Sequence, residues 1–272
     1  MNKRAQRLKP KFYEKVWGAK SLKPLFAGKG RKIGEAWLNG PRGESLPLLI
    51  KFLFTTDKLS VQVHPNDEYA AKHHGCLGKT EMWHVVAAAP GAKLAIGFRE
   101  PISRERLLAA VSDPTSNEIE TMLDWREARV GDTFFIPAGT VHAIGPGLVL
   151  CEVQQQSDIT YRLYDYGRRR EIHVEDGVAV SDCGKADAYI AEREGLLIDG
   201  KYFKVSLMKA REPKKARADY AMILRGRGTV NGKRTRAGEA WCSGSKKFVF
   251  DGVMDILLAT IPATRSSALP NL

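Results

Sequence analysis

A chain of 272 residues is long enough for one large all-β domain or two smaller ones with a substantial core. Its 43% hydrophobic and 27% charged content is ordinary for a globular protein and excludes wholesale disorder. No run approaches 18 uncharged apolar residues, and residues 1–4 lead into no apolar signal segment. We therefore expect a cytoplasmic protein with no membrane partner.

The formal net charge of +12 could attract nucleic acid, an anionic membrane or a small anionic substrate. Much of the excess lies in residues 3–11, 214–217 and 233–236. No nucleic-acid-binding motif accompanies this charge, so we expect a solvated basic surface and no nucleic-acid partner. The four cysteines are scattered without a C-x-x-C pair, which predicts reduced thiols.

Short β-like runs separated by Gly, Pro and Asp predict an all-β sandwich or barrel. The strands expected in chain order are residues 48–54, 59–64, 82–87, 133–137, 148–154 and 160–164. Helix signals occur at three places. Asn66 caps a turn through residue 74, Ser103 begins a run through 111, and Ser116 precedes residues 117–123.

A boundary is expected within residues 182–188, which divides the chain into a metal-binding catalytic unit (1–185) and a β-rich unit (186–262). The sequence Val-Asn-Gly-Lys at 230–233 predicts a hairpin in the second unit. No histidine follows His173, so we expect the second unit to hold no metal and to be structural or oligomer-forming. Residues 263–272 are expected to form a loose tail.

The strand expected at residues 59–64 carries polar side chains on one face and is followed by a proline. Side chains alternate along a strand, so Ser60, Gln62 and His64 share that face. A half-exposed strand would also show this pattern, so taken alone it does not establish a site.

Lys79 and Glu81 share a second polar face with Trp83, while His84 points the opposite way and is expected to be structural. Further on, residues 131–142 predict a hairpin, in which a Pro-Ala-Gly turn reverses the strand and the returning strand delivers His142.

Together, four of these side chains offer two imidazoles, a carboxylate and an amide oxygen: Gln62, His64, Glu81 and His142. This mixed set suits zinc or another borderline divalent ion, which would keep a positive charge and act as a Lewis acid toward sugar oxygens. Spacing alone leaves open that these are four unrelated polar residues.

Several ordered segments resemble the type I mannose-6-phosphate isomerases in their short bacterial form: residues 51–67, 78–83, 131–145 and 149–168. Trp17-Gly18 and the Gly-Glu-Ala-Trp of residues 34–37 also resemble the family's N-terminal motifs. The resemblance covers residues 10–180, and the C-terminal segment matches only loosely. The chain is too short to hold the helical domain inserted in the longer relatives.

The resemblance implies a cupin (jelly-roll) barrel with a second, smaller, cupin-like β-rich unit and a few short helices. It implies one Zn²⁺ per chain, or another divalent metal, held by Gln62, His64, Glu81 and His142. It also implies substrate contacts at Ser60, Lys51, Lys79, Glu152, Arg162 and Arg168. Arg168 stands where the longer relatives have a lysine, which keeps the charge.

The implied reaction interconverts mannose 6-phosphate and fructose 6-phosphate through an enediol, and it needs a base and a stabiliser of negative oxygen. We expect Glu152 to be the base and Arg162 to stabilise the enediolate or orient the substrate, with Thr160 and Tyr164 facing the same cavity. Lys79 is expected to stabilise charge or relay protons. Salt-bridge, packing or solvent-exposed roles remain open for each of these charged residues.

The phosphate candidates are Lys51, Ser60 and Arg168. Two other functions stay open: a metal-dependent cupin oxygenase, and a sugar-phosphate-binding cupin without catalysis. The oxygenase leaves the four cations Lys51, Lys79, Arg162 and Arg168 without a role, whereas an anionic sugar explains them. The expected partner is a small sugar phosphate, and the sequence does not decide between a monomer and a homo-oligomer.

Overall fold

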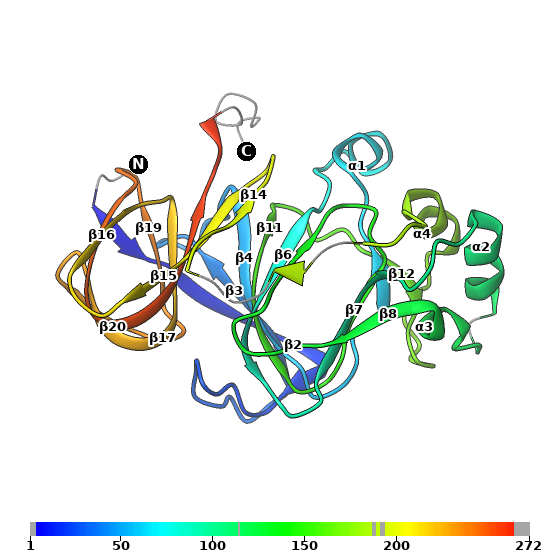
Figure 1. Cartoon of the computed structure of the whole chain (residues 1–272), viewed down its shortest axis with the longest axis horizontal. Coiled ribbons are helices and arrows are strands. Elements are labelled where there is room, and N and C mark those ends of the chain that lie inside the picture. Colours follow the sequence, from blue (N-terminus) through cyan, green and yellow to red (C-terminus); the bar gives the residue numbers. More distant parts are fainter. Residues whose placement is uncertain (1–3, 114, 187–188, 191–193, 264–272) are drawn as a thin grey trace.

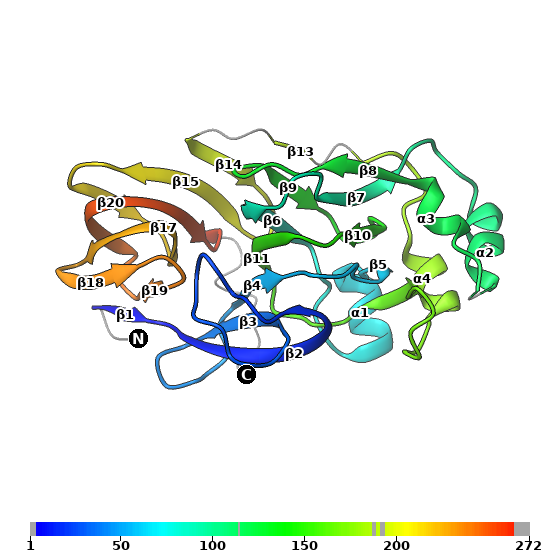
Figure 2. The ribbon, with the colours of Figure 1, turned by 90° about the horizontal axis from the view of Figure 1, so that it is seen from below.

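The computed structural model describes residues 4–113, 115–186, 189–190 and 194–263. These residues form three antiparallel sheets and four short helices (Figure 1), so the predicted all-β class with few helices is confirmed. Figure 2 shows the sheet that holds β17 (Tyr220–Val230) and β20 (Lys247–Thr260) at one end of the molecule, and α2 (Arg104–Ser112) and α4 (Val174–Val180) at the other. Among the described residues, none of the helices has the length and apolarity required to cross a membrane.

The central sheet has seven strands in the order β13-β9-β6-β11-β4-β3-β2. Its members are β2 (Lys9–Ala19), β3 (Ile33–Asn39), β4 (Leu48–Phe54), β6 (Glu81–Ala88), β9 (Thr133–Ile136), β11 (Leu148–Gln155) and β13 (Tyr189–Ile190). Both faces of this sheet are buried, as β4 illustrates. Ile50 and Phe52 pack in the cluster shared with the C-terminal sheet, whereas Lys51 and Leu53 point to the other side.

A second sheet faces that other side, with five strands in the order β12-β5-β10-β7-β8. Its members are β5 (Val61–Val63), β7 (Lys93–Phe98), β8 (Leu123–Glu127), β10 (His142–Ile144) and β12 (Tyr161–Tyr164). Trp83 and Leu150 of the central sheet share one core cluster with Leu94 and Ile144 of this sheet. The cavity described below lies between these two sheets. We refer to the two sheets together as the cupin unit, after the fold expected for this part of the chain.

The predicted helices are present as α1 (Asp67–His74), α2 (Arg104–Ser112) and α3 (Glu118–Met122). The side chains of Asn66 and Ser103 accept hydrogen bonds from the first turns of α1 and α2, as their positions in the sequence predicted. A fourth helix, α4 (Val174–Val180), was not predicted. Its N-cap is His173, whose side chain makes no capping bond, so the usual start signal is absent.

The predicted hairpin over residues 131–142 is wrong. β9 pairs with β6 and β13 in the central sheet, whereas β10 pairs with β5 and β7 in the facing sheet. The Pro-Ala-Gly segment therefore carries the chain from one sheet to the other instead of reversing it. The local turn signal is the same in both cases, and the partner of each strand is decided by tertiary packing.

The C-terminal sheet has eight strands, with β16 paired to β20 and β18 to β17 beside the path β1-β19-β17-β20-β15-β14. Its members are β1 (Ala5–Arg7), β14 (Gly195–Asp199), β15 (Lys204–Ala210), β16 (Lys214–Arg217), β17 (Tyr220–Val230), β18 (Lys233–Arg236), β19 (Ala240–Ser243) and β20 (Lys247–Thr260). The predicted hairpin is confirmed, since Val230 pairs with Lys233 and the two turn residues have positive φ.

The first strand of the chain, β1, belongs to this C-terminal sheet through its pairing with β19. The proposed division of the chain at residues 185/186 stays a prediction. The predicted tail at 263–272 lies outside the described residues, apart from residue 263.

Candidate metal centre and its cavity

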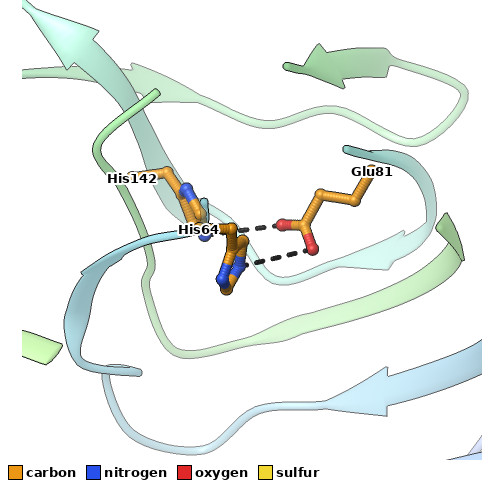
Figure 3. A group of neighbouring side chains, drawn as sticks. All are labelled: His64, Glu81 and His142. Atoms are coloured by element: carbon orange, nitrogen blue, oxygen red, sulfur yellow. Dashed lines mark ion pairs between the residues drawn. The ribbon is translucent and has the colours of Figure 1, made fainter. Parts of the chain in front are cut away.

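Two histidines and a glutamate converge between the two sheets of the cupin unit. Glu81 lies 3.5 Å from His64 Nε2 through one carboxylate oxygen and 3.4 Å from His142 Nε2 through the other. Figure 3 shows the carboxylate pointing toward both imidazoles. The three side chains are at most 1% exposed, and their potential ligand atoms all lie within 4.8 Å of one another. Within the described residues, this is the one such His/Cys/Asp/Glu group.

Strand register brings these residues together. His142 on β10 pairs directly with Gln62 on β5, and the Gln62 amide nitrogen lies 3.2 Å from His142 Nε2. His64 follows Gln62 by two residues and so points to the same side. Glu81 begins β6 on the facing sheet. The two sheets thus supply the imidazoles and the carboxylate from opposite sides.

The second nitrogen of each imidazole is held by a backbone carbonyl. His64 Nδ1 lies 2.9 Å from the carbonyl oxygen of Ile159, and His142 Nδ1 lies 2.8 Å from that of Thr140. A carbonyl can only accept, so both rings carry their proton on Nδ1 and present the Nε2 lone pair to the group.

Burial, with the nearby Lys79 charge, lowers the pKa of His142 to about 3 and that of His64 well below its ordinary value. Both imidazoles are therefore neutral at physiological pH, which is the form that binds metal ions.

Lys79 provides positive charge at this group. Its ammonium lies 2.8 Å from His64 Nε2 and also donates to Glu81. The neutral imidazole and the carboxylate thus converge on a cation in this structure. Two imidazole nitrogens and a carboxylate form a donor set that fits zinc or a similar divalent ion. Gln62 would complete the set through its amide oxygen, which in this structure accepts a hydrogen bond from Ser60.

A cavity of about 370 Å³ opens beside the group. Seven of the ten site residues predicted from the sequence line it: Lys51, Ser60, Gln62, Lys79, Glu81, Glu152 and Arg162. His64 and His142 adjoin it through their contacts with Lys79, Glu81 and Gln62. Of the ten predicted site residues, Arg168 is the one that neither lines nor adjoins the cavity.

Lys51 and Glu152 form a buried ion pair on the cavity wall. They are cross-strand partners on β4 and β11, with 3.2 Å between Nζ and the carboxylate. Burial alone would lower the pKa of Lys51, but Glu152 and Glu35 outweigh it and raise that pKa above its ordinary value. Burial raises the pKa of Glu152 to about 7, against the opposing effect of Lys51.

Arg162 lines the cavity as predicted, and so does Thr160. One terminal nitrogen of Arg162 donates to the carbonyl of Glu171 at 3.1 Å. The expectation that Tyr164 faces the same cavity is wrong. A β-bulge between Arg162 and Tyr164 breaks the alternation. Tyr164 packs beside Tyr166 on a core cluster that includes Phe98 and Leu107, which we call the outer cluster.

Arg168 donates at 2.6 Å to the carbonyl of Lys58 and at 3.1 Å to that of Asp165. Its guanidinium lies 5.3 Å from the centre of the Tyr166 ring. Arg170 lines the cavity instead. The strand period could not indicate this difference, because both arginines follow the end of β12.

Sequence reasoning also missed part of the wall, formed by Lys15, Glu35 and Trp37. The indole nitrogen of Trp37 donates to Glu35 at 2.7 Å, and Lys15 lies 3.5 Å from the same carboxylate. The Lys15 and Lys51 charges hold the pKa of Glu35 below its ordinary value, although burial acts to raise it. Glu35 and Trp37 are two residues apart in the segment 34–37, so strand alternation places them on the same face. That spacing was the sequence signal that could have indicated their place on the wall.

A β-rich fold of this topology, with a buried His/Glu group in a polar cavity, defines a cupin-type protein with a candidate metal centre. A family model described as the catalytic domain of type I phosphomannose isomerase matches residues 27–81. A mannose-6-phosphate isomerase of Streptococcus mutans is 43% identical over an alignment that covers 51% of this chain and 45% of the relative. The chain thus spans under half of that relative's length.

A Bacillus subtilis protein whose name places it with the mannose-6-phosphate isomerases is 31% identical, and the alignment covers 73% of this chain and 77% of the relative. The crystal structure of mannose 6-phosphate isomerase from Bacillus subtilis superimposes with a TM-score of 0.82 at 25% identity, covering 94% of this chain and 99% of that one. The chain belongs to the type I mannose-6-phosphate isomerase family.

Proposed function

We propose that this chain is a metal-dependent aldose–ketose isomerase that interconverts mannose 6-phosphate and fructose 6-phosphate. The observation that carries the proposal is one cavity that joins a buried His64/Glu81/His142 group to the Lys51–Glu152 ion pair. The names of the relatives supply the substrate, and the cations on the cavity wall suit its phosphate. A sugar phosphate is anionic and does not cross a membrane unaided, which favours a cytoplasmic location.

Gln62, His64, Glu81 and His142 would hold one Zn²⁺, with another divalent metal as the alternative. The neutral imidazoles with protonated Nδ1 fit this role, since each turns its Nε2 lone pair toward Glu81. When bound, the metal supplies positive charge that polarises the hydroxyl and carbonyl oxygens of the sugar.

Glu152 is the candidate base that moves the proton between C1 and C2. A base works best when its pKa lies near the working pH, and burial brings the pKa of Glu152 to about 7. Lys51, at 3.2 Å from the carboxylate, holds that carboxylate in the cavity and offers a proton donor beside it.

Arg162 and Lys79 would stabilise the negative oxygen that develops in the enediolate. Both are cationic donors on the cavity wall, and Arg162 adds a planar fork of N–H groups. Ser60, which is buried, donates to the side-chain oxygen of Gln62 at 3.2 Å and so sits where it can orient a sugar hydroxyl beside the metal centre.

An isomerase assay on metal-analysed protein tests the proposal, with mannose, fructose and glucose 6-phosphates offered separately. We expect conversion between mannose 6-phosphate and fructose 6-phosphate without oxygen consumption. Oxygen uptake with a sugar substrate would instead support a cupin oxygenase. Tight binding without turnover in metal-replete protein would support a sugar-phosphate-binding cupin.

A further inference from the structure

Three consecutive arginines follow β12 and lie in three different environments. Arg168 is held by backbone carbonyls away from the cavity wall. Arg169 is exposed and does not line the cavity. Arg170 lines the cavity together with Glu171 and His173 of the same segment. The chain thus places one of three identical side chains at the substrate cavity.

Arg170 is fixed by a buried acid. Its Nε and one terminal nitrogen donate to the two carboxylate oxygens of Asp165 at 2.7 and 2.5 Å. The Asp165 side chain is 1% exposed, whereas that of Arg170 is 31% exposed. This fork-to-fork pairing sets the guanidinium plane, and none of the contacts among the described residues uses the other terminal nitrogen, Nη1.

Three arginines near this end of the cavity share one buried carboxylate, that of Asp165, because Asp158 and Glu171 are exposed. Asp165 also lies 3.4 Å from Arg168, so a single carboxylate serves two guanidinium groups. Arg162 adds a third nearby cation, and its pKa is lowered by burial and then by the Arg170 charge. Glu171, the other acid of the segment, is 82% exposed and its carboxylate lies 3.7 Å from His173. A bound dianion would relieve the repulsion between Arg162 and Arg170.

We propose that Arg170 receives the phosphate group of the sugar phosphate, with Asp165 as its positioning residue and Arg168 as a structural support of the loop. This inference rests on the proposed function, because it takes the sugar phosphate as the ligand of the cavity. The phosphate contact is assigned to Arg170 because this residue lines the cavity, whereas the family resemblance implied Arg168.

Calorimetric titration of the metal-replete full chain with mannose 6-phosphate, and separately with inorganic phosphate, tests it. The variants are Arg170→Gln, Arg168→Gln and the matched control Arg169→Gln, which removes the same charge from the same loop. Losing a charge-assisted hydrogen bond to phosphate weakens binding by about tenfold to a hundredfold. We expect this loss for both ligands in Arg170→Gln, and a change below about twofold in Arg169→Gln.

Arg168→Gln is expected to lower the thermal midpoint while it keeps affinity closer to that of Arg169→Gln. If Arg170→Gln binds both phosphates as tightly as Arg169→Gln, the inference is overturned. Equal losses in all three variants would also overturn it, because they would reflect net charge alone. Wild-type protein that binds mannose 6-phosphate without isomerising it would refute the proposed function while the Arg170 comparison still decides this inference. Wild-type protein that binds neither ligand would refute both.

Discussion

Strand alternation buries side chains both in the cupin unit and on the inner face of the C-terminal sheet. The buried side chains differ in kind, since the cupin unit buries charged groups and the C-terminal sheet buries aromatic rings. Facing positions on β4 and β11 carry Lys51 and Glu152, both buried. In the C-terminal sheet, alternate positions of β20 carry Phe248 and Phe250, whose stacked rings have centroids 5.7 Å apart. One interior is arranged for chemistry and the other for packing.

The contrast shows how this chain tolerates buried charge. Taking charged groups out of water costs several kcal/mol per ion in order of magnitude, and close pairing recovers only part of it. The apolar face of the central sheet packs against the C-terminal sheet, with Phe52 and Met82 in one cluster with Leu207 and Leu257. We infer that this packing supplies the stability that the polar face of the same sheet lacks.

The largest expected effect falls on the cupin interior. His64→Ala or His142→Ala removes a ligand that the remaining side chains cannot replace, so metal content should fall to background and isomerase activity with it. Elemental analysis and the isomerase assay check this on the same sample. His73→Ala, a change of an exposed histidine, is the control. Stoichiometric metal and normal turnover in either ligand variant would refute the site assignment.

The other interior should behave in the opposite way. Phe250→Ala leaves a cavity in a fully buried aromatic cluster and should cost about 3–5 kcal/mol of unfolding free energy. Metal content and kcat should stay at the wild-type value at temperatures where the variant is folded. Denaturant titration followed by metal analysis makes the measurement. A folded variant that had lost its metal would contradict the division of roles between the two interiors.

Arg162→Lys tests the role of a single cation on the cavity wall. One ammonium cannot reproduce the planar fork of donors, so transition-state stabilisation should fall by about 2–4 kcal/mol with metal content unchanged. Steady-state kinetics should show this as a lower kcat at nearly constant KM. A rise in KM alone would make Arg162 a contact of the bound substrate, and wild-type kinetics would remove it from the mechanism.

The smallest effect concerns pH. With the pKa of Glu152 near 7, the carboxylate is the active form, so it is lost as pH falls below that value. The rate should therefore drop about tenfold for each unit of pH below 7, as expected for one essential base. A profile measured on metal-saturated protein checks this. Activity that is flat between pH 8 and about 5 would exclude Glu152 as a base of this pKa.

The metal group was predictable from sequence because strand alternation and a recognisable set of motifs both pointed to it. Gln62 and His64 share a face by period alone, and the structure pairs Gln62 directly with His142. The route by which His142 arrives was not predictable. A turn signal does not say whether the following strand joins the same sheet or the facing one, since packing decides that choice.

The cavity's outer wall was harder to predict. Arg168 and Arg170 have the same side chain and follow the end of β12, so neither composition nor period separates them. Asp165 distinguishes the two arginines, because its buried carboxylate holds Arg170 at the cavity through two hydrogen bonds. The prediction that Tyr164 faces the cavity was wrong for a related reason, since a single bulge after Arg162 turns Tyr164 to the outer cluster.

We propose that one divalent ion, held between the two sheets of the cupin unit, is required for isomerisation. The direct measurement removes the metal with a chelator and adds zinc back in steps, with bound metal and mannose 6-phosphate isomerisation recorded in each sample. Activity should rise in proportion to bound metal and stop rising at one ion per chain. Full activity in metal-free protein, or saturation with no isomerisation, would contradict it.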